Sequence, residues 1–79
     1  MNAISQQPKE QDHISRAQDH MRLADILFLE ADRFERFRCA SLASDKLEDA
    51  AEWKHLAAAC RVSAEARVRR ADKLTGARP

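Results

Sequence analysis

The fragment EWKH is the one stretch of this sequence that has the spacing of a metal-binding motif. Glu52 and His55 are three residues apart, as in the Glu-x-x-His pairs of helical di-iron carboxylate proteins. Such a site also needs carboxylates from other helices, which Glu30 or Glu35 could supply after dimerisation. The motif occurs once, and Trp53 rather than Glu52 follows the apolar pattern of the segment. Metal binding is therefore the third hypothesis, and we expect no cofactor.

Two other histidines recur one heptad apart, in the internal repeat QDHISRA followed by QDHMRLA. On a helix, His13 and His20 lie about 10 Å apart, too far to bind one ion together. We interpret them as interfacial or solvent-facing residues that could make association sensitive to pH. The sequence contains no Ser-His-Asp or Cys-His arrangement, glycine-rich phosphate loop or zinc-ligand spacing. We therefore predict that the protein is not an enzyme.

The C-terminal part of the chain is basic. Residues 61–79 contain six Lys or Arg and two Asp or Glu, whereas residues 1–60 contain eight and eleven. Such a cluster could contact nucleic-acid phosphates. Its candidate residues are Arg61, Arg67, Arg69, Arg70 and Lys73. Cations near a helix C-terminus are also favoured by the helix dipole, and no aromatic residue is interleaved with them. A dimeric DNA-binding regulator is therefore the alternative function.

A chain of 79 residues is at most one domain. Its core is so small that a cross-link or a binding partner would add much to its stability. The sequence has no signal-peptide pattern and no apolar run long enough to span a membrane, so a cytoplasmic location is expected. Its two cysteines, Cys39 and Cys60, are too few for a disulfide framework. We predict that both are small buried thiols.

The scarcity of helix breakers predicts an all-α fold. The chain has one glycine and two prolines, and both prolines lie near its ends. Asp45 and Glu48 have the spacing of a capping box, and Gly76 is a helix stop signal. The predicted organisation is a flexible arm at residues 1–8, then a single helical domain at 9–75, with a helix at about 9–39, a turn at about 40–45, a helix at about 46–74, and a tail at 76–79.

Both predicted helices carry a heptad seam, which indicates a long antiparallel hairpin. The first seam is Ile14, Ala17, Met21, Ala24, Phe28 and Ala31, and the second is Ala50, Trp53, Ala57, Cys60, Ala64, Arg67, Ala71 and Leu74. A register that sets large residues against small ones places Trp53 opposite Ala31 and Phe28 opposite Ala57. A break at residues 18–22 would instead give a three-helix bundle, and dimerisation would give a four-helix bundle.

The first helix has more apolar residues than one seam can bury. A second stripe consists of Leu23, Ile26, Leu27, Phe34 and Phe37, with Glu30 among them. A second copy, a broken helix or a foreign protein could cover it. Glu30 would pair with Arg33 or a lysine of the second helix, or with a cation of a bound protein. Leu29, which belongs to neither stripe, is predicted to be exposed. We take the second stripe together with Glu30 as the candidate partner-binding site.

In its size, helical content and lack of catalytic motifs, the chain resembles the small antiactivators of bacteria and their mobile elements. Those proteins bind quorum-sensing transcription activators and keep them from working. The resemblance implies an all-helical inhibitor that docks a helix face on a larger protein, such as a transcription factor. It extends over the general character of the whole chain and transfers no individual residue.

Overall fold

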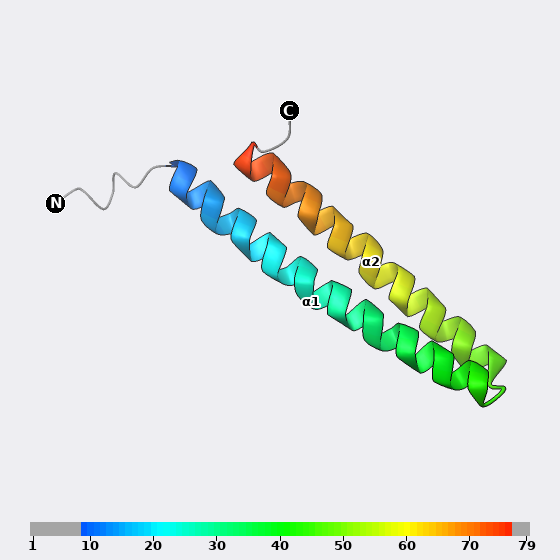
Figure 1. Ribbon diagram of the computed structural model, residues 1–79. Coiled ribbons are helices and arrows are strands. Elements are labelled where there is room, and N and C mark those ends of the chain that lie inside the picture. Colours follow the sequence, from blue (N-terminus) through cyan, green and yellow to red (C-terminus); the bar gives the residue numbers. More distant parts are fainter. Residues whose placement is uncertain (1–8, 77–79) are drawn as a thin grey trace.

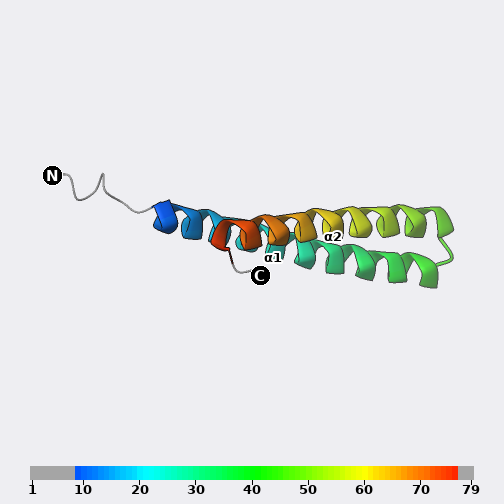
Figure 2. The ribbon, with the colours of Figure 1, turned by 90° about the horizontal axis from the view of Figure 1, so that it is seen from above.

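The protein is a two-helix antiparallel hairpin. The computed structural model describes residues 9–76, and the predictions for residues 1–8 and 77–79 lie outside that range. Helix α1 spans Lys9–Ala43 and helix α2 spans Leu47–Thr75, and the two run side by side along their length (Figures 1 and 2). Within residues 9–76 there is no strand. The predicted all-α fold and hairpin are confirmed.

Helix α1 is longer and more regular than predicted. Its 35 residues continue through residues 18–22, so the predicted alternative of a break there is wrong. The helix also ends at Ala43 instead of residue 39. The segment CASLA contains neither glycine nor proline, and its two alanines favour helix continuation more strongly than its one serine opposes it.

Backbone geometry, and not a capping box, makes the turn between the helices. The Lys46 N–H donates to the Ser41 carbonyl at 2.8 Å, and Asp45 adopts a left-handed conformation with φ of 63°. Lys46 precedes α2 without a side-chain cap, so the predicted role of Asp45 as a cap is wrong. Asp45 instead supplies the positive φ that this short link requires, which aspartate tolerates better than most residues. The predicted stop is confirmed, because Gly76 has φ of 66° and donates to the Asp72 carbonyl.

Alanines spaced seven residues apart form the interface between the helices. The buried apolar residues of the described chain are Ala17, Ala24 and Ala31 on α1, and Ala50, Ala57, Ala64 and Ala71 on α2. No large side chain in the described part is fully buried. Because a methyl group is the whole side chain at each position, the two backbones can approach closely along this alanine seam.

The axial register differs from the prediction. Trp53 stacks on Phe34, whereas the predicted register placed it opposite Ala31, three residues away. The contact between His20 and Arg67 shows the same displacement at the other end of the hairpin. This register sets Ala57 level with Ala31, so small residues meet small ones. Large-against-small pairing is wrong because the large residues lie beside the seam instead of within it.

Large side chains flank the alanine seam on two opposite faces of the hairpin. Residues three and four positions after a seam alanine lie on opposite sides of it. Leu27 and Phe34 are on one side and half-buried, whereas Ile14, Met21 and Phe28 are on the other and 38 to 42% exposed. The predicted first seam is therefore correct at its alanines but wrong in treating its large residues as the covered ones.

Candidate protein-interaction face

An aromatic cluster joins the two helices near the turn. The Phe34 and Trp53 rings stack with centroids 5.6 Å apart, and Phe37 tilts against Trp53 at 4.9 Å. The two phenylalanine rings are also neighbours, with centroids 6.4 Å apart. Offset and tilted geometries at these distances are favourable for aromatic pairs. Phe34 and Trp53 are half-buried and Phe37 is exposed, so the cluster both holds the hairpin and presents rings to its surroundings.

A charged pair borders the cluster. The Arg33 guanidinium donates to the Glu30 carboxylate at 3.1 Å and lies 5.9 Å from the centre of the Phe37 ring. Glu30 is half-buried, and its predicted pairing with Arg33 is confirmed. Because both side chains retain contact with solvent, this ion pair contributes little to stability and can exchange partners. Leu29, at 65% exposure, lies outside the cluster as predicted.

The remaining predicted partner-binding residues extend this surface toward the middle of the hairpin. Ile26 is 54% exposed and Leu23 is 41% exposed, while Leu27 is half-buried. We define the aromatic face as the side of the hairpin formed by Leu23, Ile26, Leu27, Glu30, Phe34 and Phe37 of α1 with Trp53, Leu56 and Cys60 of α2. It contains three of the four aromatic residues of the chain.

Sequence reasoning missed the contribution of α2 to this face. The heptad pattern places Trp53 in the seam and leaves out Leu56, which is 45% exposed one turn beyond it. Trp53, Leu56 and Cys60 are three and four residues apart, but whether they share a face with Phe34 depends on which side of the alanine seam each helix turns toward the other.

The nucleic-acid candidates do not gather on one surface. Arg67 donates to His20 Nδ1 at 3.1 Å, and Arg61 lies 3.4 Å from Glu35, so α1 engages both. Arg70 lines a shallow hollow on the aromatic-face side together with Leu27 and Arg67. The other two candidates, Arg69 and Lys73, are exposed.

The opposite side of the hairpin is crossed by charges. We define the mixed face by Ile14, Met21, Phe28, Glu35, Arg61 and Val68. Glu35 pairs with Arg38 at 2.9 Å and with Arg61 of the other helix at 3.4 Å. The hydrogen bond from Arg38 lowers the pKa of Glu35, desolvation opposes this shift, and the hydrogen bond from Arg61 lowers the pKa further.

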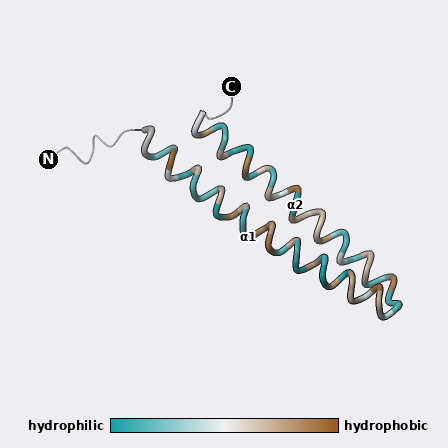
Figure 3. Tube along the Cα trace, viewed as in Figure 1, coloured by the Kyte–Doolittle hydropathy of each residue, from teal (hydrophilic) through white to brown (hydrophobic). Residues whose placement is uncertain are grey.

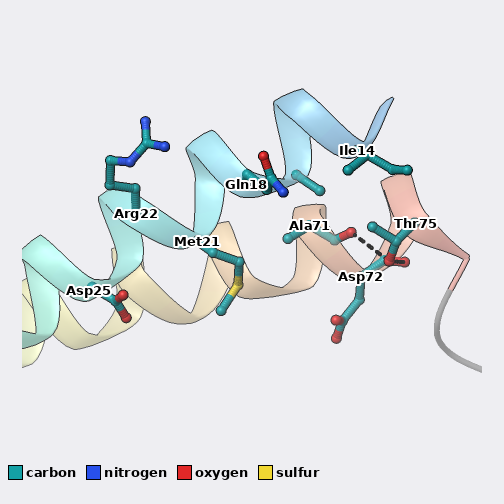
Figure 4. A pocket seen from close by; sticks show the side chains of 9 residues that line it. Ile14, Gln18, Met21, Arg22, Asp25, Ala71, Asp72 and Thr75 are labelled. Carbon is teal, nitrogen blue, oxygen red and sulfur yellow. Dashed lines mark hydrogen bonds between the residues drawn. The ribbon is translucent and has the colours of Figure 1, made fainter. Parts of the chain in front are cut away.

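A groove lies at the open end of the mixed face, where the helices have no connecting turn. Ile14 and Met21 line it from α1, and Ala71 and Thr75 line it from α2 (Figure 4). The Thr75 hydroxyl donates to the Ala71 carbonyl at 3.2 Å, so this hydroxyl is engaged by its own helix. The groove has no aromatic side chain in its lining, which makes the aromatic face the stronger candidate for binding a protein.

The metal hypothesis gains no further ligand from the fold. Glu52 and His55 are both exposed on α2. In the described part of the chain, no three His, Cys, Asp or Glu side chains gather closely enough to hold a metal ion. The prediction of two buried thiols is wrong for Cys39, which is exposed, while Cys60 is half-buried on the aromatic face. Cys39 is exposed because α1 turns it away from α2.

Apolar and polar segments alternate along both helices, with an apolar stretch near the middle of α1 (Figure 3). Neither described helix combines the length and the apolar character needed to cross a membrane.

Comparisons of the chain with protein-family models, curated proteins and solved structures find no match.

Proposed function

We propose that this chain is a small regulatory protein that binds a larger protein through its aromatic face and inhibits it by occupying a surface. The observation that carries the proposal is the exposure of Leu23 and Ile26 beside the cluster of Phe34, Phe37 and Trp53. An exposed apolar surface that includes aromatic residues is typical of a binding site for another protein. A transcriptional activator is the proposed partner, by resemblance to the antiactivators.

The helical form of the face supports this mode of binding. Leu23 and Ile26 lie one turn apart on α1, and Phe37 extends the same side of the helix toward the turn. Apolar anchors at such spacings allow a helix to dock in a groove of its partner. The rigid hairpin holds these anchors in place before binding, which limits the entropy lost on association.

The charged border supports selectivity. Because the Glu30–Arg33 pair is accessible, a cation of the partner can compete for the Glu30 carboxylate, and an anion can compete for Arg33. Such exchanges contribute more to orientation and to the rejection of wrong partners than to affinity.

Substitution of exposed residues tests the proposal. Phe34 and Leu27 pack toward α2, so replacing them would disturb the hairpin as well as the face. Leu23→Asp and Ile26→Asp change the face and leave the seam intact. Matched controls are Leu29→Asp and Val62→Asp, at positions 65 and 63% exposed away from the aromatic face. Affinity capture with the wild type identifies the partner, and calorimetry with the purified partner measures the affinity of each variant.

We expect Leu23→Asp and Ile26→Asp each to weaken partner binding at least tenfold, whereas the two controls bind like the wild type. In cells, expression of the wild type should reduce transcription from a promoter that the partner activates, and Ile26→Asp should relieve that repression. Wild-type affinity in the Leu23→Asp and Ile26→Asp variants, with helicity retained in circular dichroism, would contradict the proposal.

A further inference from the structure

The hairpin is a single layer of helices. Its Cα atoms span only 12 Å in the thinnest direction. Its described core consists of seven alanines together with Ser41. Each buried alanine adds only one methyl group to this core, and stable domains usually bury a core between two packed layers. The hairpin therefore has the elements of a domain but lacks a second layer.

We propose that in the free protein a second copy supplies this layer by packing its aromatic face on that of the first, turned end for end. Two hairpins then form a four-helix bundle, and α2 of one copy lies antiparallel to α2 of the other. The two copies bury Phe34, Phe37 and Trp53 in a shared core. The bundle also covers the proposed partner-binding surface. It follows, on the basis of the proposed function, that the partner and the second copy compete for one face.

The aromatic face suits this role better than the mixed face. Its ion pair lies within α1, where the exposed Arg33 side chain donates to the Glu30 carboxylate. The mixed face contains Glu35, which pairs with Arg38 of its own helix and with Arg61 of the other. Covering that charged group would remove three ions from water, a cost that their mutual attraction does not reliably offset. The mixed face is therefore the outer surface of the bundle.

The available area matches that of a stable interface. Helix α2 has 29 residues, so it is about 43 Å long, and two helices side by side are about 20 Å wide. A second hairpin laid along this length covers about 860 Å² of each copy, close to the ~800 Å² per partner of standard stable interfaces.

The distribution of charge favours the end-for-end orientation. On α2, Arg67 and Arg70 lie on the aromatic-face side of the open end, whereas Asp49 and Glu52 lie near the turn. When the second copy is reversed, the arginines of each copy approach the carboxylates of the other. A bundle with both open ends together would bring the four arginines close to one another, which costs free energy.

The two cysteines provide a test that needs no change to the protein. Cys60 lies on the aromatic face and Cys39 is exposed elsewhere. We expect iodoacetamide to alkylate Cys60 at least tenfold more slowly when the wild-type protein is concentrated than when it is dilute. The rate at Cys39 should not change with concentration. Equal concentration dependence at both thiols, or none at Cys60, would overturn the proposal.

Solution mass gives the second test. Sedimentation equilibrium of the wild type should show a reversible change from 9.0 kDa to about twice that mass as concentration rises. Ile26→Asp should raise the dissociation constant about tenfold or more, because it places a charge at the margin of the surface that the second copy covers. Leu29→Asp should leave the constant unchanged. A wild type that stays at 9.0 kDa across the whole range, or a dimer indifferent to Ile26→Asp, would overturn the proposal.

Charge reversal tests the orientation. Arg70→Glu should weaken the dimer about tenfold by setting like charges against Asp49 of the other copy. Adding Asp49→Lys to Arg70→Glu should restore most of the wild-type affinity. A double variant that is no better than Arg70→Glu alone would overturn the end-for-end arrangement.

A competition experiment tests whether the partner and the second copy bind the same face. It also distinguishes a failure of the dimer from a failure of the proposed function. When two fluorescently labelled copies are mixed, added partner should abolish energy transfer between them. If the wild type is monomeric, the dimer is wrong but the proposed function stands. If partner binding ignores Leu23→Asp and Ile26→Asp while dimerisation responds to them, the dimer stands and the proposed function is wrong. If the partner binds without dissociating the labelled dimer, the inference that the two compete for one face is wrong.

Discussion

The two halves of the hairpin share one alanine seam but differ in what flanks it. Near the turn, the Phe34, Phe37 and Trp53 rings pack across the seam, and Glu35 and Arg61 join the helices on the opposite side. Near the open end, Arg67 donates a hydrogen bond across the seam to His20. Alanine allows close approach everywhere, but the flanking side chains determine how strongly each half is held. Perturbing the seam and each flank separately tests this difference.

The largest effect is expected from filling the seam itself. Ala57 is fully buried, and Ala57→Leu would force the helices apart, at a cost of about 3 kcal/mol in the free energy of unfolding. Urea unfolding followed by circular dichroism, at one fixed protein concentration, measures this cost. The matched control is Ala58→Leu at the neighbouring exposed position, which should change stability by less than ~0.5 kcal/mol. Equal stability of both variants would show that the seam is not closely packed.

Removing the tryptophan should weaken the half near the turn. Trp53→Ala deletes the ring that both phenylalanines contact, and we expect a loss of about 2 kcal/mol in the free energy of unfolding. Leu56→Ala, on the same face one turn away, should cost less than half as much when both are measured by thermal or urea unfolding. A similar cost for the two variants would mean that the aromatic contacts add nothing beyond burial.

Removing the hydrogen bond between His20 and Arg67 near the open end should lower the free energy of unfolding by less. His20→Ala takes away the acceptor for Arg67 and should cost about 1 kcal/mol. The loss should appear in hydrogen exchange as faster exchange of amides near residues 17–24 and 64–71, with little change near the turn. His55→Ala, at an exposed position on α2, serves as the control. Uniformly faster exchange along both helices would show that the two halves unfold as one unit.

The smallest expected effect is the loss of stability at low pH that comes from the ion pairs of Glu35. The folded-state pKa of Glu35 is lowered below its ordinary 4.5, so its pairing stabilises the fold above that value. This contribution is lost as pH falls through the lowered pKa. Glu35→Gln lacks the charge, so it should be less stable than the wild type at pH 7 and approach wild-type stability below the folded-state pKa. Parallel unfolding series at several pH values measure this, and a constant difference would contradict it.

Much of the fold could be predicted from local sequence features. The scarcity of glycine and proline predicted two long helices, and the alanines recurring every seven residues identified the inner face of each. Gly76 marked the end of α2, and Leu29 was correctly placed outside both stripes. Each of these features depends on a helical period or on one residue's conformational preference, which a sequence contains directly.

The candidate site was only partly predictable. The α1 residues from Leu23 to Phe37 were named, together with the pairing of Glu30 and Arg33. The contributions of Trp53 and Leu56 were missed because they depend on which side of the seam each helix turns toward the other. The buried state predicted for Cys39 failed for the same reason, since a small residue near a seam can lie on either side of it.

The sequence by itself determined the helices, the alanine seams and the excess of apolar residues. Only the tertiary structure decided the register and the grouping of Phe34, Phe37 and Trp53 into one surface. A heptad pattern defines a helix face but not the axial position of its partner, because sliding by a few residues keeps two seams in contact. The short link through Asp45 and the stacking of Phe34 on Trp53 set that position.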